Sequence, residues 1–166
     1  MENINVKITV KNFGEIELEL YPDKAPKTVE NFVMLANSNF YENLIFHRVI
    51  PGFMIQGGGF DSSMNDTNAA SIKGEFASNG FSQNDIKHKR GVISMARNQF
   101  DYNSASSQFF ICLRNSCSTD LDGQYAAFGK ITEGMEIIDK ICESVPESDC
   151  IPADQQPVIE TIKVID

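Results

Sequence analysis

The stretch INVKITVKNFGEIELEL, residues 4–20, decides the fold class of this 166-residue chain. Apolar and polar side chains alternate along both of its halves, with apolar residues at Ile4, Val6, Ile8 and Val10 and again at Ile16, Leu18 and Leu20. A two-residue period is typical of strands that bury one face. Residues 11–14 end in a glycine, which adopts positive φ readily, so the stretch predicts an antiparallel hairpin.

The period changes after this hairpin. Between Pro26 and Asn37 apolar residues recur at i, i+3, i+4 and i+7, which predicts an amphipathic helix with proline in its first turn. The same spacing between Gly134 and Pro146 predicts a second helix. The Ser-, Asn-, Asp- and Gly-rich residues 60–88 predict long surface loops that belong to the same domain.

Six further apolar runs, each bounded by Gly, Pro, Asn or Asp, predict short strands. They lie near residues 44–47, 53–57, 92–96, 108–113, 126–131 and 158–165. Closing a sheet into a barrel removes exposed strand edges. We therefore expect a mainly β protein, a closed eight-stranded antiparallel β-barrel capped by two α-helices, with residues 1–166 forming a single domain.

The composition of the chain disfavours several classes of partner and binding site. A net charge of -9 disfavours nucleic acid and anionic membrane surfaces as partners. Charged residues interrupt the first thirty positions and no later apolar stretch reaches membrane-spanning length, so we expect a cytoplasmic protein. The four cysteines, Cys112, Cys117, Cys142 and Cys150, lack CxxC spacing, which predicts reduced thiols and no metal site.

The segment FHRVIPGFMIQGG at residues 46–58 sets an arginine and a glutamine among bulky apolar side chains. It resembles the signature stretch of cyclophilins, and SMAR at 94–97, SQFFI at 107–111 and LDGQYAAFGK at 121–130 follow in the family's order. The similarity extends from about Val6 to Ile165. The resemblance implies a peptidyl-prolyl cis-trans isomerase that binds proline-containing peptides and folding proteins in a groove on the outer face of the barrel, without a cofactor.

The resemblance also assigns candidate site residues. The family's catalytic arginine matches Arg48, and Phe53 and Gln56 complete the expected catalytic set. Substrate-binding positions match Met54, Ala96, Arg97, Asn98, Gln108, Phe110, Leu121 and Tyr125. Of these, Phe53, Met54, Phe110 and Leu121 are expected to form the pocket for the substrate proline.

Elementary chemistry supports a role for Arg48. Rotation about an X-Pro bond removes the amide conjugation, so the proline nitrogen regains a lone pair that a guanidinium can bind only in the twisted state. A charge-assisted hydrogen bond of about 1.5 to 3 kcal/mol corresponds to roughly ten- to a hundredfold in rate. Arg48 alone therefore cannot supply the whole rate enhancement.

Four positions depart from the pattern of well-known cyclophilins. Asp120 and Tyr125 stand where a tryptophan and a histidine are found, while Gly59 and Arg97 replace an aspartate and an asparagine. An aspartate lacks the indole face and its N–H donor, so we expect weak binding of cyclosporin, the inhibitor associated with the family. These departures affect fine substrate preference more than the reaction.

Other interpretations of the same residues are weaker. His47 beside Arg48 suggests acid–base chemistry, but isomerisation moves no proton, and a histidine in an apolar run is usually structural. The competing function is a proline-peptide binding module or holdase chaperone with little turnover, which would not require Arg48. The sequence contains no long apolar heptad pattern, so we expect a monomer.

Overall fold

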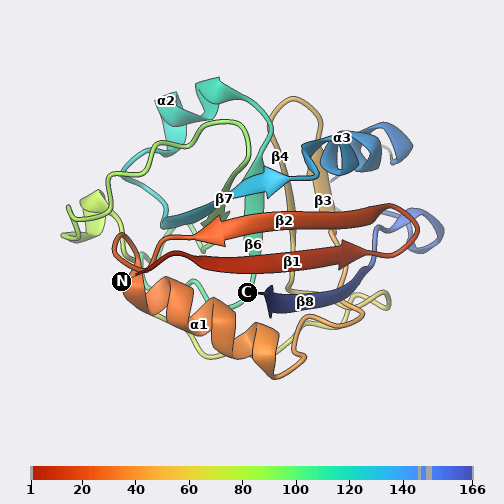
Figure 1. Ribbon diagram of the computed structural model, residues 1–166, viewed down its shortest axis with the longest axis horizontal. Coiled ribbons are helices and arrows are strands. Elements are labelled where there is room, and N and C mark those ends of the chain that lie inside the picture. Colours follow the sequence, from red (N-terminus) through yellow and green to blue (C-terminus); the bar gives the residue numbers. More distant parts are fainter. Residues whose placement is uncertain (1, 146, 149–150, 166) are drawn as a thin grey trace.

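The structure, a computed structural model, describes residues 2–145, 147–148 and 151–165 (Figure 1). The predicted helix stop at Pro146 and the fourth cysteine, Cys150, lie outside these residues. The described chain forms one antiparallel sheet with the strand order β3-β4-β6-β5-β7-β2-β1-β8. Its strands are β1 (Ile4–Val10), β2 (Gly14–Leu20), β3 (Arg48–Ile50), β4 (Met54–Gly57), β5 (Val92–Met95), β6 (Phe109–Cys112), β7 (Ala127–Glu133) and β8 (Ile159–Ile165). The predicted mainly β, antiparallel fold is confirmed.

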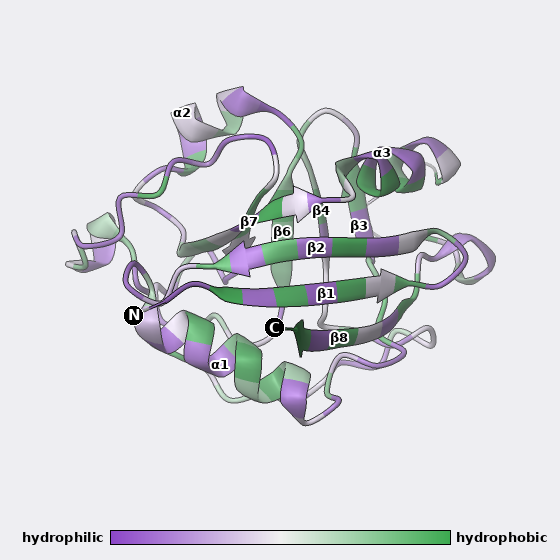
Figure 2. Ribbon diagram, in the orientation of Figure 1, coloured by the Kyte–Doolittle hydropathy of each residue, from purple (hydrophilic) through white to green (hydrophobic). Residues whose placement is uncertain are grey.

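The hairpin formed by β1 and β2 has the register expected from the alternation. Ile8 pairs with Ile16, and Val6 pairs with Leu18. All four of these side chains are buried, whereas the residues between them are partly exposed. Figure 2 shows this pattern as alternating hydrophobic and hydrophilic bands along both strands. The two-residue period therefore reports which face of this hairpin enters the core.

The sheet curls into a half-barrel, so the prediction of a closed barrel overstated how far the sheet closes. Its two end strands are β3 and β8, and within the described residues they share no ladder. The residues that precede them approach through one isolated bridge between Ile45 and Val158. The backbone N–H of Phe46 donates to the carbonyl of Pro157 at 3.0 Å. The sheet ends thus meet through irregular backbone.

The prediction of a strand at residues 44–47 was wrong, because these residues belong to the irregular backbone that precedes β3. Ile45 and Phe46 are completely buried, but the chain there makes only isolated bridges, and the strand begins at Arg48. Burial in the core produces an apolar run whether or not the backbone belongs to a ladder. Hydrophobicity alone therefore could not distinguish the two cases.

Both predicted helices are present, as α1 (Pro26–Asn37) and α3 (Met135–Ser144). In Figure 1, α1 lies below the β1–β2 hairpin and α3 above it, and buried side chains of both helices belong to the same interior core. The described residues also contain a third, α2 (Ser118–Leu121), which is too short to show a period in the sequence. Single turns of 3-10 helix lie at Ala77–Asn79, Asn115–Cys117 and Ala153–Gln155. The prediction of two helices therefore omitted α2.

The first turn of α1 is held by a residue far away in the sequence. Its N-cap residue, Ala25, has no side chain that could accept a hydrogen bond. The carboxylate of Glu75, which is buried, accepts instead from the Thr28 backbone N–H at 2.6 Å and from the Thr28 hydroxyl at 2.7 Å. A negative charge is favourable at a helix N-terminus, so Glu75 substitutes for the missing local cap.

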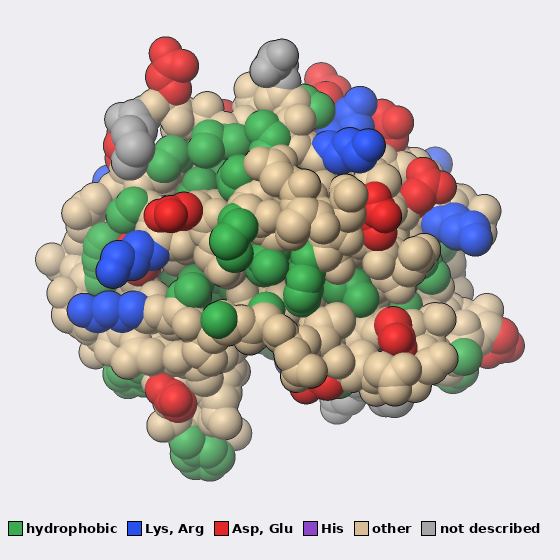
Figure 3. Space-filling model, turned by 90° about the horizontal axis from the view of Figure 1, so that it is seen from below, with side chains coloured by type: hydrophobic (Ala, Val, Ile, Leu, Met, Phe, Trp, Pro, Cys, Tyr) green, Lys and Arg blue, Asp and Glu red, His purple; other side chains and the backbone are tan. Residues whose placement is uncertain are grey.

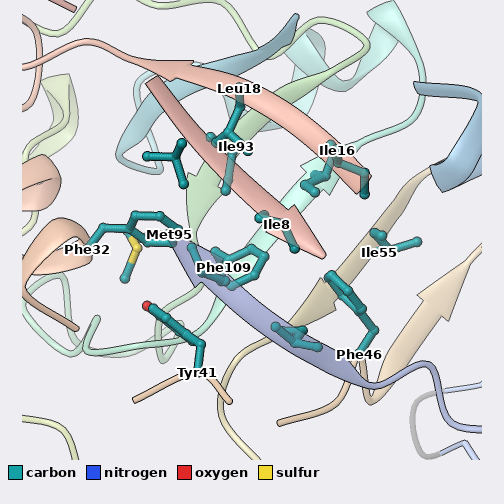
Figure 4. Packing of buried hydrophobic residues seen from close by; sticks show 14 of the residues in the cluster. Ile8, Ile16, Leu18, Phe32, Tyr41, Phe46, Ile55, Ile93, Met95 and Phe109 are labelled. Atoms are coloured by element: carbon teal, nitrogen blue, oxygen red, sulfur yellow. The ribbon is translucent and has the colours of Figure 1, made fainter. Parts of the chain in front are cut away.

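The interior of the half-barrel is packed with apolar side chains from both the sheet and α1 (Figure 4). Phe109 lies at its centre, with the ring centroids of Phe32, Tyr41 and Phe46 within 5.9 Å. The edge-on contacts among these rings are a favoured aromatic geometry. The barrel interior is therefore structural core, and a ligand must bind elsewhere.

The distribution of charged side chains on the surface agrees with the acidic net charge of the chain. In Figure 3, Lys and Arg side chains lie singly or in small groups among Asp and Glu side chains, without a continuous basic surface on that face. Among the described residues, no helix is both long and apolar enough to cross a membrane.

Candidate active site

The site is built on the outer face of β4 and β6. Along β6, Phe109 and Ile111 point into the core, whereas Phe110 and Cys112 belong to a second apolar cluster. β4 divides in the same way, with Ile55 inside and Met54 in the second cluster. Cys117, Leu121 and the partly buried Ile50, Phe53, Ala96 and Tyr125 complete this outer cluster.

A cavity of about 220 Å³ opens over the outer cluster. It is lined by Arg48, Phe53, Met54, Gln56, Ala96, Arg97, Phe110, Leu121 and Tyr125. A second cavity of about 210 Å³ shares three of these residues and is lined by Gln56, Ala96, Arg97, Asn98, Ser104, Ser106 and Gln108. The structure thus brings all eleven predicted site residues together around two joined cavities. Ser104 and Ser106 are additional polar residues that sequence reasoning missed.

Arg48 is connected to the two glutamines of the site. It pairs with Gln56 across β3 and β4, and its Nη1 lies 3.4 Å from Gln56 Oε1. Gln56 Nε2 in turn donates to Gln108 Oε1 at 2.8 Å. This second bond fixes the amide so that its oxygen faces the guanidinium. Arg48, Gln56 and Gln108 thus form a row of polar side chains beside the cavities.

Three consecutive glycines, Gly57, Gly58 and Gly59, lie at the end of the signature segment and immediately after it, and each packs closely against its neighbours. A Cβ atom at Gly59 would overlap the Gln108 side chain, and one at Gly57 would come within 2.9 Å of the backbone and ring of Phe46. Gly58 has φ of 87°, which favours glycine. Glycine at position 59 therefore leaves room for the Gln108 side chain, whereas Gly57 allows close approach to the backbone at Ile45 and Phe46.

Phe110 is held from two sides. Its ring meets Tyr125 edge-on at 5.6 Å and stacks on His88 at 6.1 Å with an interplanar angle of 14°. Aromatic pairs in these geometries stabilise each other beyond their buried area. The ring that forms the floor of the first cavity is therefore fixed before any ligand arrives.

His88 lies beneath this floor in a complete hydrogen-bond network. It is completely buried, with Nδ1 3.0 Å from Asp122 Oδ1 and Nε2 2.9 Å from Ser94 Oγ. Burial lowers the pKa of His88, and this outweighs the opposing effect of Asp122. The neutral imidazole supports Phe110 from behind. No sequence motif marked His88 for this role, because its partners come from separate parts of the chain.

The histidine, cysteine and aspartate side chains that could carry other chemistry do not line the first cavity. His47 is buried with its ring against Phe60 at 4.8 Å. Cys112, Cys117 and Cys142 are free thiols, and burial raises the pKa of the Cys112 thiol behind the cavity. Among the described residues, no group of three or more His, Cys, Asp or Glu could hold a metal ion. Asp120 is exposed on α2, immediately before Leu121.

The fold and the site together define a class of proteins. Its members are curled antiparallel half-barrels with a preformed cleft on the outer face of the sheet. The chain belongs to the cyclophilin family, since the family model described as cyclophilin type peptidyl-prolyl cis-trans isomerase/CLD matches residues 5–165. It is accordingly an isomerase.

Similar proteins agree with this assignment. The chain is 46% identical over 149 residues to a peptidyl-prolyl cis-trans isomerase of Acinetobacter baylyi, covering 87% of this chain and 75% of that protein. It is 46% identical over 161 residues to peptidyl-prolyl cis-trans isomerase A of Dickeya dadantii, covering 92% and 80%. A crystal structure of a Cryptosporidium parvum cyclophilin type isomerase superimposes with a TM-score of 0.83 at 28% identity, covering 99% of both chains.

Proposed function

We propose that this isomerase rotates X-Pro bonds of peptides and folding proteins in the first cavity, with the proline ring held by the apolar residues and Arg48 acting on its nitrogen. One observation carries the proposal: Arg48 shares a single cavity with four apolar side chains, Phe53, Met54, Phe110 and Leu121. A cyclophilin type isomerase with a TM-score of 0.82 to this chain has been solved in the presence of the dipeptide Ala-Pro.

The size and chemistry of the cavity support this use. About 220 Å³ accommodates a proline ring with part of its backbone, and the apolar residues of the lining offer the ring a hydrophobic surface. Held in this way, the proline is oriented toward Arg48 without further loss of rotational freedom. Gln56 keeps the guanidinium in place, so the donor needs no reorganisation as the amide twists.

A comparison of free energies indicates how much of the rate enhancement each part of the site would supply. The planar amide opposes rotation by about 18 to 20 kcal/mol. One charge-assisted hydrogen bond to the twisted nitrogen contributes about 1.5 to 3 kcal/mol, or ten- to a hundredfold in rate. The remaining acceleration comes from the apolar pocket, which favours the twisted amide because the proline ring is fixed while the preceding carbonyl turns.

The experiment is a protease-coupled or NMR exchange assay on a proline peptide, with peptide affinity measured in parallel. Arg48→Ala should reduce kcat/KM by about ten- to a hundredfold while leaving most of the peptide affinity. Arg48→Lys should recover only part of the loss, because an ammonium lacks the planar fork. Equal losses of turnover and affinity in Arg48→Ala would favour the alternative, a proline-peptide binder or holdase.

Arg114 provides a matched control. It is exposed and lies over the Phe53 ring at 5.5 Å, but it does not line the cavity. Arg114→Ala should change kcat/KM by at most about fivefold, because exposed charges contribute up to about 1 kcal/mol. A loss as large as that of Arg48→Ala would indicate that positive charge in general, and not the position of Arg48, supports turnover.

Weak cyclosporin binding is part of the proposal. Asp120 is exposed beside Leu121 and offers a carboxylate where several well-known cyclophilins have an indole. We expect inhibition only above micromolar cyclosporin, and Asp120→Trp should strengthen it while peptide turnover stays within about twofold, because Asp120 does not line the cavity. Sub-micromolar inhibition of the unmodified protein, measured by the same assay, would contradict this expectation.

A further inference from the structure

Arg97 is held in an unusual environment at the junction of the two cavities. Its guanidinium carbon lies over the rings of Tyr125, Tyr102 and Phe76, at 4.5, 4.9 and 5.2 Å from their centroids. Its Nε and Nη2 both donate to the carbonyl of Gln124, at 3.0 and 2.8 Å. Three rings and a shared carbonyl therefore hold the guanidinium in one orientation before substrate binds.

The charge of Arg97 has no acidic partner in the described part of the chain. Its hydrogen bonds go to backbone carbonyls, those of Gln124 and, from Nη1, of Asn98 at 3.1 Å. A guanidinium has five N–H donors, so one on Nη1 and one on Nη2 remain for a ligand. A half-buried cation with two donors available is a suitable partner for a carboxylate.

The surroundings of Arg97 favour an anionic ligand in spite of the overall charge. The two cavities are lined by Arg48 and Arg97 and by no aspartate or glutamate, whereas the chain as a whole carries a net charge of -9. Asn98, Ser104, Ser106 and Gln108 make the second cavity polar. A polar lining of this kind suits a charged or polar group of the substrate better than an apolar side chain.

We propose that Arg97 is a specificity-determining residue, which selects substrates carrying an acidic side chain close to the proline. The inference rests on the proposed function: with the proline ring in the first cavity, the adjoining peptide passes over Gln56, Ala96 and Arg97 into the second. A glutamate or aspartate there accepts hydrogen bonds from the two remaining N–H groups of Arg97. Because the rings already fix the guanidinium, little side-chain entropy is lost on binding.

The test compares matched peptides that carry Glu or Gln at each of the two positions before and the two positions after proline. In the unmodified protein one position should favour Glu over Gln by about tenfold in kcat/KM, which equals about 1.4 kcal/mol. In Arg97→Gln this ratio should fall to about one. The preference should also weaken between about 20 and 500 mM NaCl, because salt screens a partly exposed ion pair.

Two controls separate the possible outcomes. Lys163→Gln removes the same charge from β8, at the other end of the strand order from the site, and should leave the Glu/Gln ratio unchanged. Melting temperature and turnover of the Gln peptides show whether Arg97→Gln is folded and active. Absence of any Glu preference, or a preference that survives in Arg97→Gln, would overturn the inference while the proposed function stands. Failure of the unmodified protein to turn over any peptide would instead overturn the proposed function.

Discussion

The two faces of β4 and β6 differ in what they bury, although alternate residues of the same two short strands form them. On the inner face, Phe109 is completely buried and surrounded by other rings. On the outer face its neighbour Phe110 is almost as well buried, but its ring is the floor of an open cavity. Burial alone therefore does not distinguish a core residue from a residue that lines a cavity.

What distinguishes the faces is the placement of polar groups. In the inner cluster the neighbours of Phe109 are apolar or aromatic side chains. On the outer face Gln56 and Arg48 lie in register with each other across β3 and β4, beside Phe110. A polar side chain in an otherwise apolar strand must find partners or contact water. Gln56 was thus the strongest local sign that this face holds a site.

The largest expected effect is on the inner face. Phe109→Ala should lower the free energy of unfolding by about 3 to 5 kcal/mol, because it opens a cavity among rings that cannot collapse fully. Urea denaturation monitored by circular dichroism measures this loss. Phe109→Leu, which keeps most of the volume, should lose clearly less. A loss below about 1 kcal/mol for Phe109→Ala would contradict the central position assigned to this ring.

Substitution of the neighbouring Phe110 should affect activity more than stability. Phe110→Ala should reduce kcat/KM by about ten- to a hundredfold, since a ring-sized apolar contact with proline contributes about 1.5 to 3 kcal/mol. Its effect on the free energy of unfolding should be smaller than that of Phe109→Ala, because one side of the ring already borders the cavity. If the two variants lost stability equally and activity equally, the comparison of the faces would fail.

The smallest effect concerns pH and the network behind Phe110. Because the pKa of His88 is lowered in the folded protein, below about pH 6.5 the unfolded chain binds a proton that the folded protein refuses. The free energy of unfolding should therefore decrease as pH falls from about 6.5, by at most about 1.4 kcal/mol per pH unit. His88→Gln should be less stable at pH 8 but should lose this dependence.

Denaturation of both proteins between pH 8 and 5 measures the difference. The pKa of Asp122 is also lowered, because hydrogen bonds from His88 outweigh the burial that would raise it, but its contribution is lost only below about pH 4. Measurements between pH 8 and 5 therefore lie above the range in which Asp122 takes up its proton. The same slope in the unmodified protein and in His88→Gln would show that the buried imidazole is not its source.

Sequence reasoning succeeded where a local pattern has one structural cause. The alternation of residues 4–20 predicted the β1–β2 hairpin, because only a strand buries every second side chain. It failed where burial has several causes, as at residues 44–47, and where an element is too short to repeat, as in α2. His88 was missed because nothing near it in the chain indicates that its ring lies under Phe110.

The sequence by itself determined the strand and helix periods, the order of the motifs and, through that order, the family and the candidate site residues. The tertiary structure decided that the sheet stays a half-barrel, that the eleven candidate residues surround two joined cavities, and that Arg97 is enclosed by three rings. The physical reason is distance along the chain. Periodicity records contacts between near neighbours, whereas the cleft and its charges arise from segments that only folding brings together.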